Sequence, residues 1–592
     1  MHEEERASLL AEAEAWIAED PSPSDRDELR ALIAQNAWEE LRERFRERLE
    51  FGTAGLRAPL GAGPSRMNLA VVQMATKGLV EVLLRHVPRA QERGLVIGRD
   101  GRRGSAEFAK AAASVALGMG MRVHFFEEAV PTPLVSFACT ALQASGGVVI
   151  TASHNPPEYN GYKVYWEDGA QIIPPFDKEV AQAMRAASPS QIPLLDLNEA
   201  RRSGKLVEVP ESIGQAYIHA IEGLLMHRDV GRSLKIAYTA LHGVGEKWVH
   251  AALKRAGFEH IHSVPEQAEP DGNFPTVTFP NPEEKGAMDM VLALAQRVDA
   301  ELVLANDPDA DRLAVAVRAS PSHPRAGEFV VLSGNEVGCL LAHHLLTHAP
   351  YRGKHPLIVS SLVSTPWLGP ITLAHGAKWE QTLTGFKWIA RRLAEGAKAG
   401  HTPLLGFEEA LGYSIGGVVP DKDGISAALV VADMAAYYAS RGLTLLDALD
   451  ELARRYGLYL SRQISVTQKG QGGIARIQQL MEQARQQKPK CFGKWLIHTI
   501  CDYEKGKRSF TDGKEETMNL PKANMLSFEL DGGHRIMMRP SGTEPKIKFY
   551  FDVKAEISNG EAVLEARNRG EEMLSDLIQN FFAKIGMNQN AA

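Results

Sequence analysis

Short apolar runs alternate with amphipathic segments along most of the chain. The apolar runs have the length of strands, and the segments between them have helical periodicity that often ends at a glycine, as at Gly120 and Gly257. Strands that read as continuous apolar runs are typical of parallel or mixed sheets covered by helices on both faces. The pattern predicts strands at 95–98, 122–126, 147–151, 234–238, 301–305, 313–317, 357–361 and 403–407, and helices at 106–119, 246–256 and 425–440.

Both ends of the chain depart from this alternation. The first 50 residues predict two amphipathic helices separated by Pro21-Ser22-Pro23, the second opened by Ser24 with Asp27 in a pattern similar to a capping box. From Ser461 onward the order becomes strand, helix, several strands and a long final helix, which indicates an α+β domain. The predicted strands there are 525–530, 535–538 and 547–553, and the final helix begins near residue 561.

The length of 592 residues corresponds to about four domains at roughly 150 residues each. We therefore expect three α/β domains with mixed sheets and a smaller C-terminal α+β domain. The expected boundaries are a helical extension at 1–50, α/β domains at 51–225, 226–345 and 346–460, and the α+β domain at 461–592.

Composition and charge disfavour several classes of protein. The chain has 66 basic and 73 acidic residues and a net charge of −7, which disfavours binding to nucleic acid or to a membrane surface. Its four cysteines form no C-x-x-C pair, which disfavours a disulfide framework or a zinc module. The N-terminus lacks the pattern of a signal peptide, and no apolar run approaches the roughly 18 residues of a membrane span. We expect a cytoplasmic protein.

The loop after the predicted strand 147–151 is the first candidate for chemistry. It reads Thr-Ala-Ser-His-Asn-Pro-Pro-Glu-Tyr-Asn-Gly-Tyr-Lys over residues 151–163. A serine held in a rigid loop, here Ser153, can carry a phosphoryl group if cations neutralise the phosphate. Taken alone, the loop is better explained as a polar turn in which Ser153 and Asn155 cap backbone groups.

A second candidate loop, Asn306-Asp-Pro-Asp-Ala-Asp-Arg312, follows the predicted strand 301–305. Carboxylates at alternate positions supply the hard oxygen ligands that Mg²⁺ prefers. An EF-hand is excluded. Counted from Asp307, the sixth position of this segment is Arg312, where an EF-hand has glycine, and the twelfth is Arg318, where an EF-hand has glutamate. So many like charges between two buried strands need a cation, which disfavours a merely solvated turn.

Two further loops and two glycine-containing segments carry weaker signals. Glu408 and Glu409 end a predicted strand and can accept hydrogen bonds from sugar hydroxyls, although such a pair is also common beside a helix start. Arg539-Pro-Ser-Gly-Thr-Glu-Pro-Lys-Ile-Lys548 combines the groups of a phosphate cradle, and its alternative is a hairpin turn with cationic edges. Phe51–Arg57 and Leu383–Lys387 add basic groups.

Taken in order, these segments resemble the α-D-phosphohexomutase superfamily, and within it the phosphoglucomutase branch of the phosphoglucomutase-2 and phosphopentomutase type. The resemblance runs from about Phe51 to Lys548, and the Thr-Ala-Ser-His-Asn-Pro and Asp-Pro-Asp-Ala-Asp-Arg motifs are its specific part. It implies three related α/β domains and a smaller fourth domain that closes over a central cleft.

The resemblance also implies roles for individual residues. Ser153 corresponds to the phosphorylated serine, and Asp307, Asp309 and Asp311 to the Mg²⁺ ligands, with one phosphoserine oxygen completing the site. Glu408 corresponds to the residue that contacts sugar hydroxyls. The implied groups around the transferring phosphoryl are Arg57, His154, Lys163, Arg312 and Lys387, and those around the substrate are Thr384, Gly385, Arg539, Ser541, Gly542, Thr543 and Lys548.

Two positions depart from the commoner family pattern. Ala410 stands where many relatives have serine, and Gly412 stands where others have histidine. Loss of the hydroxyl changes the recognition of the hexose, and loss of the histidine makes Lys387 the expected proton-transfer group. Both changes suit the phosphoglucomutase-2 type.

We therefore expect a phosphoglucomutase that interconverts glucose 1-phosphate and glucose 6-phosphate through phosphorylated Ser153, with Mg²⁺ and glucose 1,6-bisphosphate as cofactor and intermediate. Phosphopentomutase, phosphomannomutase, sugar bisphosphate synthase and a phosphoserine hydrolase are the alternative enzymes, and a sugar-phosphate binding protein is the alternative outside catalysis. The expected partner is a sugar phosphate, with neither nucleic acid nor membrane, and the expected state is a monomer or weak homodimer. A hinge near residue 460 is expected to move the fourth domain.

Overall fold

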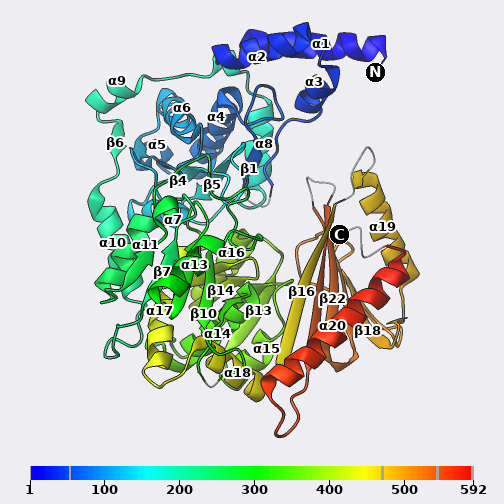
Figure 1. The fold of residues 1–592 in the computed structure, drawn as a ribbon. Coiled ribbons are helices and arrows are strands. Elements are labelled where there is room, and N and C mark those ends of the chain that lie inside the picture. Colours follow the sequence, from blue (N-terminus) through cyan, green and yellow to red (C-terminus); the bar gives the residue numbers. More distant parts are fainter. Residues whose placement is uncertain (1, 53–54, 322, 468–472, 542–545, 588–592) are drawn as a thin grey trace. The chain divides into compact units, whose positions relative to one another are not determined.

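The computed structural model describes the chain except for residues 1, 53–54, 322, 468–472, 542–545 and 588–592 (Figure 1). The chain divides into two units. Unit 1 comprises residues 1–317, 385–395 and 410–440, and unit 2 comprises residues 318–384, 396–409 and 441–592.

Two mixed sheets organise unit 1. In the first, β4, β2, β3 and β6 are parallel, and β5 and β1 add antiparallel strands at one edge. In the second, β9, β7 and β8 are parallel and β10 returns antiparallel to β9. The strands of these two sheets in unit 1 are β1 Leu56–Pro59, β2 Leu95–Arg99, β3 Val123–Phe125, β4 Gly146–Ile150, β5 Tyr159–Trp166, β6 Leu206–Glu208, β7 Ile236–Thr239, β8 Ile261–Ser263, β9 Leu302–Asn306 and β10 Leu313–Arg318. Unit 1 also contains the residues of β15, Gly412–Ile415.

Helices pack on these sheets with their apolar sides. α4 begins where Asn68 accepts a hydrogen bond from the backbone N–H of Val71, and it buries most of its residues against the first sheet. The helices of unit 1 are α1 Glu3–Glu19, α2 Pro23–Ala34, α3 Trp38–Phe45, α4 Leu69–His86, α5 Ala90–Arg93, α6 Ser105–Gly118, α7 Thr132–Ala141, α8 Phe176–Arg185, α9 Leu197–Arg202, α10 Glu211–Glu222, α11 Glu246–Arg255, α12 Pro265–Ala268, α13 Asp289–Val298 and α17 Gly424–Ala439. α16 (Phe386–Lys398) begins in unit 1.

Unit 2 contains a parallel sheet followed in sequence by an antiparallel one. β13, β12 and β14 are parallel. The C-terminal sheet has the order β16-β23-β22-β21-β18-β19-β20, with α19 and α20 packed on it, and α20 is the red helix in Figure 1. The elements are β11 Phe329–Leu332, β12 Pro356–Ser361, β13 Lys378–Thr382, β14 Thr402–Glu408, β16 Leu458–Thr467, β17 Cys491–Phe492, β18 Trp495–Asp502, β19 Lys507–Phe510, β20 Glu515–Thr517, β21 Leu526–Leu530, β22 His534–Pro540, β23 Lys546–Ala555, α14 Gly334–His348, α15 Leu368–Ala374, α18 Leu445–Tyr456, α19 Gly473–Gln487 and α20 Val563–Ile585.

These elements confirm the expected fold class of α/β domains with mixed sheets and a C-terminal α+β domain. Two expectations about elements were wrong. The N-terminal segment forms three helices rather than two, and the cap of α2 is Ser22, which accepts from the backbone N–H of Asp25, rather than Ser24. The C-terminal sheet also contains β17–β20, which the apolar pattern did not indicate.

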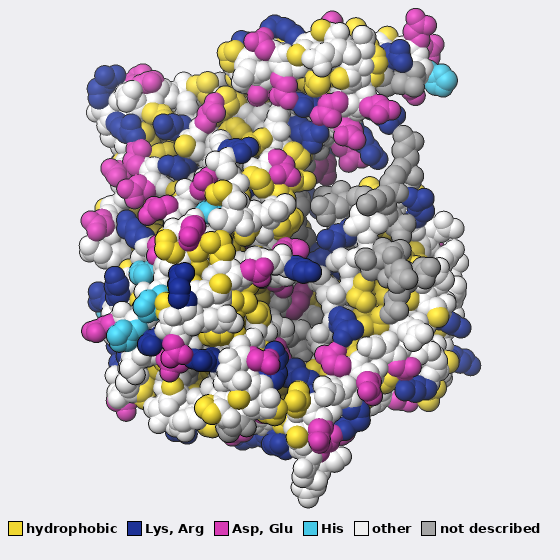
Figure 2. All heavy atoms as spheres, in the orientation of Figure 1, with side chains coloured by type: hydrophobic (Ala, Val, Ile, Leu, Met, Phe, Trp, Pro, Cys, Tyr) yellow, Lys and Arg dark blue, Asp and Glu magenta, His cyan; other side chains and the backbone are white. Residues whose placement is uncertain are grey.

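On the face drawn in Figure 2, basic and acidic side chains are interspersed, and neither sign forms a broad field. Among the helices that the structure describes, none combines the length and the apolar character needed to cross a bilayer.

Candidate active site

Ser153 lies in the loop that directly follows β4, and its backbone has a left-handed φ of 55°. Its backbone N–H donates a hydrogen bond to Thr151 Oγ1 at 2.8 Å. Left-handed backbone is unfavourable for residues other than glycine, and where it occurs it is often found at functional sites. The loop therefore holds the Ser153 hydroxyl in one direction.

One buried guanidinium sets the shape of this loop. Arg102 donates hydrogen bonds to the carbonyl oxygens of Ser153 at 2.6 Å, Asn155 at 2.5 Å and Pro156 at 2.9 Å. Its Nε lies 3.2 Å from Asp100 Oδ2, and both side chains are buried. Arg102 therefore holds the loop around Ser153 through these carbonyl oxygens, and Asp100 compensates the charge of the guanidinium.

Three aspartates occupy the turn between β9 and β10, and the structure brings Ser153 to them. Ser153 Oγ donates a hydrogen bond to Asp307 Oδ2 at 2.8 Å. Lys163 Nζ, from β5, lies 2.6 Å from Asp309 Oδ2 and 2.8 Å from Asp311 Oδ2. All five side chains are buried. Segments that are more than a hundred residues apart in sequence thus form one polar cluster in unit 1.

The aspartate cluster has the donor set of a cation site. One carboxylate oxygen from each of Asp307, Asp309 and Asp311 lies within 4.8 Å of the others. Asp309 Oδ1 and Asp311 Oδ1 are buried and accept no hydrogen bond from any residue that the structure describes. Buried carboxylate oxygens without partners are unfavourable unless a cation compensates them. The cluster can therefore hold a metal ion with a preference for hard oxygen ligands.

The surrounding charges act differently on the aspartates. Burial, reinforced by the charge of Asp311, raises the pKa of Asp309. Burial also acts on Asp311, but Lys163 and Lys422 outweigh it and hold the pKa of the Asp311 carboxyl well below its ordinary value. Lys422 Nζ lies 3.2 Å from Asp311 Oδ2. Asp311 is therefore ionised in the metal-free protein, and Asp309 is the carboxylate that gains most from an added cation.

Other basic side chains predicted for the site surround the same cluster. His154 Nδ1 lies 3.4 Å from Ser153 Oγ. Burial and the charges of Arg312 and Arg57 lower the pKa of His154 well below its ordinary value, so the imidazole is neutral. Arg312 Nε lies 4.0 Å from Asp307 Oδ2, and Arg57 Nε is buried without a hydrogen-bond partner among the described residues.

Lys387 is also in unit 1, near the start of α16. Its Nζ lies 3.7 Å from Asp177 Oδ2, and the side chain is 9% exposed. Burial lowers the pKa of Lys387, and the charge of Asp177 opposes that shift. Lys387 thus forms its ion pair with Asp177 rather than with the aspartate cluster.

In unit 2, Glu408 ends β14 and Glu409 directly follows it, and the two carboxylates have different surroundings. Glu409 accepts hydrogen bonds from Ser361 Oγ at 2.8 Å and Ser364 Oγ at 3.0 Å. Burial and the neighbouring charge of Glu408 raise the pKa of Glu409. Glu409 is therefore fixed by its own sheet, while Glu408 is the carboxylate that the sequence assigns to the sugar.

The predicted phosphate loop connects β22 and β23. Arg539 and Lys548 are register partners on these strands, and the backbone N–H of Ser541 bonds to the carbonyl of Lys546 at 2.7 Å. Gly542 and Thr543, predicted for the same loop, lie outside the described residues.

The segment 384–385 is the remaining predicted substrate contact. Gly385 has a φ of 115°, and Thr384 Oγ1 is buried with no hydrogen-bond partner in the part of the chain that the structure covers. The expected convergence of the residues in unit 2 with those in unit 1 stays a prediction.

Sequence reasoning missed several residues that support the site. Besides Arg102 and Asp100, Thr132 Oγ1 donates to Asp309 Oδ2 at 2.7 Å, and Asp421 Oδ1 lies 3.1 Å from the Nζ of Lys422. A signal was present for the first pair, because Arg99–Gly104 is a polar, glycine-containing run directly after the apolar strand 95–98. Thr132 and Asp421 carry no comparable local signal.

Comparison with known proteins agrees with this fold and this set of motifs. Three family models match, described as phosphoglucomutase/phosphomannomutase α/β/α domains I, II and III, at residues 48–191, 215–320 and 333–456. A putative phosphomannomutase from Thermus thermophilus has a similar structure, with a TM-score of 0.64 and 22% identity over 90% of this chain and 99% of that chain. The open form of the parafusin phosphoglucomutase from Paramecium also has a similar structure, with a TM-score of 0.64 and 17% identity over 90% of this chain and 96% of that chain.

The chain belongs to the phosphoglucomutase/phosphomannomutase family, which is a family of enzymes. It is 37% identical to the phosphopentomutase of Homo sapiens, over 98% of this chain and 96% of that protein. It is 34% identical to the glucose 1,6-bisphosphate synthase of Homo sapiens, over 96% and 93%. A probable phosphomannomutase of Haemophilus influenzae is 38% identical, over 82% of this chain and 93% of that protein.

Proposed function

We propose that this chain is a sugar-phosphate mutase that moves a phosphoryl group between two hydroxyls of one sugar by way of Ser153. The observation that carries the proposal is the hydrogen bond of 2.8 Å between Ser153 Oγ and Asp307, in a buried cluster that also contains Lys163 and two further carboxylates. A nucleophilic hydroxyl beside a cation site and a fixed ammonium is the set of groups that phosphoryl transfer needs.

Asp307, Asp309, Asp311 and an oxygen of Ser153 would hold Mg²⁺. The ion, when bound, supplies positive charge to the phosphoryl oxygens as charge redistributes in the transition state. The buried oxygens of Asp309 and Asp311 that accept no hydrogen bond from a described residue support this assignment.

The proposed first step starts from phosphorylated Ser153: the bond between phosphorus and Ser153 Oγ breaks as a bond from phosphorus to the oxygen of a free sugar hydroxyl forms. The serine oxygen leaves with the bonding electron pair and takes up a proton, which balances the proton that the sugar hydroxyl loses. The proton of that hydroxyl leaves to a base, and Lys387 is our candidate because burial lowers its pKa toward the range of a proton-exchanging group. Arg57, Lys163 and Arg312 stabilise the negative charge of the transferring group. The sugar bisphosphate then reorients, and its other phosphoryl group returns to Ser153.

Residues of unit 2 are assigned to the part of the substrate that does not react. Glu408 accepts hydrogen bonds from sugar hydroxyls, and Arg539, Ser541 and Lys548 bind the second phosphate. The register pairing of Arg539 with Lys548 supports this role, because it places two cations on adjacent strands at the phosphate loop.

The preferred sugar is the finer part of the proposal. The motif resemblance favours glucose 1-phosphate, whereas the relatives named phosphopentomutase, at 36–37% identity over nearly the whole chain, favour a pentose 1-phosphate. We propose the pentose phosphate as the better substrate and glucose 1-phosphate as the second. Ala410 is consistent with this order, because it leaves the segment after Glu408 without the serine hydroxyl that the resemblance implies for many relatives.

The test is a side-by-side assay of the full chain with glucose, mannose, ribose and deoxyribose 1-phosphates, primed with glucose 1,6-bisphosphate and Mg²⁺. We expect positional isomers to accumulate without release of inorganic phosphate. Release of phosphate in step with substrate loss would instead identify a hydrolase. Formation of bisphosphate only with an acyl phosphate donor would identify a synthase, the activity named for the relative at 34% identity.

Ser153→Ala should abolish turnover and incorporation of phosphate into the protein. Ser136→Ala is the matched control, because Ser136 is also buried in unit 1 but donates only to the carbonyl of Gly169. Retention of mutase activity in Ser153→Ala, or its loss in Ser136→Ala, would reject the assignment of Ser153 as the carrier.

A further inference from the structure

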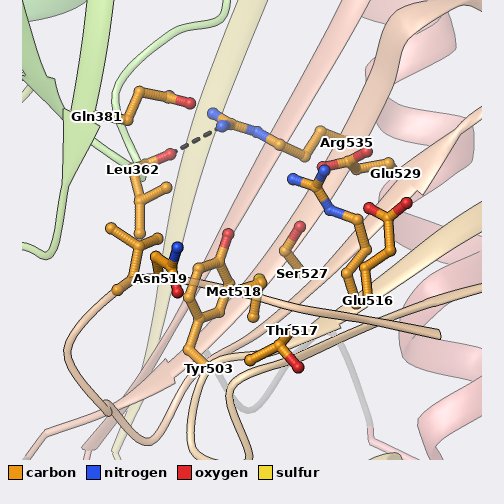
Figure 3. Close-up of a pocket in the computed structure, with 12 residues that line it drawn as sticks. Leu362, Gln381, Tyr503, Glu516, Thr517, Met518, Asn519, Ser527, Glu529 and Arg535 are labelled. Carbon is orange, nitrogen blue, oxygen red and sulfur yellow. Dashed lines mark hydrogen bonds between the residues drawn. The ribbon is translucent and has the colours of Figure 1, made fainter.

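Unit 2 contains a cavity of about 320 Å³ that includes none of the residues assigned above to catalysis or substrate binding (Figure 3). Its floor is the C-terminal sheet, where Glu516, Arg508, Cys501 and Ser527 are successive register partners on β20, β19, β18 and β21. Residues in direct register share one face of a sheet, so this row lies on one side. The volume is at the lower end of the range of small-molecule sites.

The walls come from elsewhere in unit 2. Leu362 follows β12 and Gln381 belongs to β13, whereas Met518 and Leu520 come from the segment between β20 and β21. Arg535 donates to the carbonyl oxygen of Leu362 at 2.7 Å. Figure 3 shows this bond at the top of the cavity, with Tyr503 and Ser527 below it. A molecule in the cavity would thus contact both the parallel sheet and the C-terminal sheet.

The charged side chains that line the cavity have partners of opposite sign. Arg535 Nη2 lies 2.6 Å from Asp552, and Glu516 lies 2.7 Å from Lys514. The charge of Glu529 acts on Arg508. The lining therefore has no excess of either sign, and a phosphate or another strongly charged group would lose its hydration without a net compensating charge. This balance favours an uncharged ligand.

Hydrogen-bonding groups of the lining are nevertheless unmatched. Gln381 Nε2 and Arg508 Nε are buried donors with no hydrogen-bond partner among the described residues. Glu529 Oε1 accepts from the Cys501 thiol at a long distance of 3.9 Å. Buried donors without partners are unfavourable, so the cavity calls for a ligand that accepts from some groups and donates to others. Hydroxyl groups do both.

We propose that this cavity binds an uncharged polyhydroxylated molecule, a free monosaccharide or a nucleoside, separately from the phosphoserine site. Adjacent hydroxyls of the ligand would accept from Gln381 and Arg508 and donate to Glu529. The aliphatic surfaces of Leu362 and Met518 would contact its C–H groups. The proposal does not depend on the mutase activity, because it uses a different set of residues.

Hydrogen exchange on the full chain tests the proposal, with D-ribose, methyl α-D-glucopyranoside and uridine as probes. At saturation we expect slower exchange in peptides covering residues 507–530, with one molecule bound per chain by calorimetry. The glucoside and uridine arms distinguish a sugar site from a nucleoside site. Stronger protection of the same peptides by ribose 5-phosphate than by ribose would overturn the argument from charge.

Two variants and one control localise the binding. Glu529→Met and Gln381→Leu should each weaken probe binding about tenfold, the effect of losing one hydrogen bond of roughly 1.4 kcal/mol. Glu515→Gln is the matched control, because Glu515 neighbours Glu516 on β20, is exposed and pairs with Lys507. The two variants lie on different sheets, so misfolding of one leaves the other informative. Unchanged binding in both, or protection confined to residues 151–163 and 539–548, would reject the site.

Discussion

Replacing Lys163 with methionine removes the ammonium group that compensates the buried aspartates. Lys163 Nζ contacts Asp309 and Asp311 at 2.6 and 2.8 Å, and its side chain is 1% exposed. Loss of one partner of a buried ion pair costs about 3–5 kcal/mol, because the remaining charge is left uncompensated. Asp309 can take up a proton, since burial already raises its pKa. We therefore expect the loss of stability to lie near the lower end of this range, about 3 kcal/mol.

Native-state hydrogen exchange of peptides covering residues 302–318 gives the free energy of local opening in EDTA and in MgCl₂. We expect Lys163→Met to lower this free energy of opening by about 3 kcal/mol in EDTA. A divalent cation at a hundred times its dissociation constant stabilises a site by about 2.7 kcal/mol, so MgCl₂ should restore most of the loss. The added stabilisation should be larger in the variant than in the wild type, because the cation replaces the missing charge.

Lys77→Met is the matched control for this experiment. Lys77 pairs with Glu81 at 2.6 Å on α4, with side chains 23% and 35% exposed, so its loss should change the free energy of unfolding by less than about 1 kcal/mol. An equal effect of the two substitutions in EDTA, or no response of Lys163→Met to MgCl₂, would refute the account of the aspartates as a charged cation site.

Three further outcomes follow from burial and backbone geometry. Ser153→Gly should be more stable than Ser153→Ala by about 1 kcal/mol in thermal unfolding, because alanine keeps a Cβ at a φ of 55°; equal melting temperatures would argue against backbone strain in the loop. Burial lowers the pKa of His343 from 6.5 to about 4, so between these pH values the unfolded chain binds more protons at His343 than the folded chain does. The free energy of unfolding of unit 2 should therefore fall by about 3 kcal/mol as pH decreases from 6.5 to 4, and His343→Gln should flatten the pH dependence measured by urea unfolding. Burial raises the pKa of the thiols of Cys139, Cys339 and Cys501, whereas Cys491 is only partly buried. A thiol reagent should therefore modify Cys491 first. Faster labelling of one of the three buried thiols in the folded protein would contradict the packing.

The elements that the sequence predicted well are those whose pattern comes from burial. β4 and β9 are buried at every position and read as continuous apolar runs. β19 and β20 could not be found in this way, because their residues are exposed or half-buried and are held by antiparallel pairing with the neighbouring strands β18 and β19 rather than by burial. The extra N-terminal helix was missed because Trp38–Phe45 is short and largely polar, and it packs through Leu41.

The candidate site shows the same division. Ser153 and the aspartates belong to contiguous motifs, so the sequence indicated them together with their chemistry. Thr132 and Lys422 reach Asp309 and Asp311 from other elements through the tertiary fold alone. The pairing of Lys387 with Asp177 likewise depends on the packing of α16 near α8, which no local pattern specifies.

The bonds from Arg102 to the serine loop matter for reading natural sequence variation in this gene. A substitution at Arg102 would release three carbonyl oxygens around Ser153 and leave Asp100 as an uncompensated buried carboxylate. Such an allele would leave both family motifs intact, yet it would encode a protein in which Ser153, the proposed phosphoryl carrier, is misplaced. Screening for inactive alleles should therefore weigh position 102 as heavily as position 153.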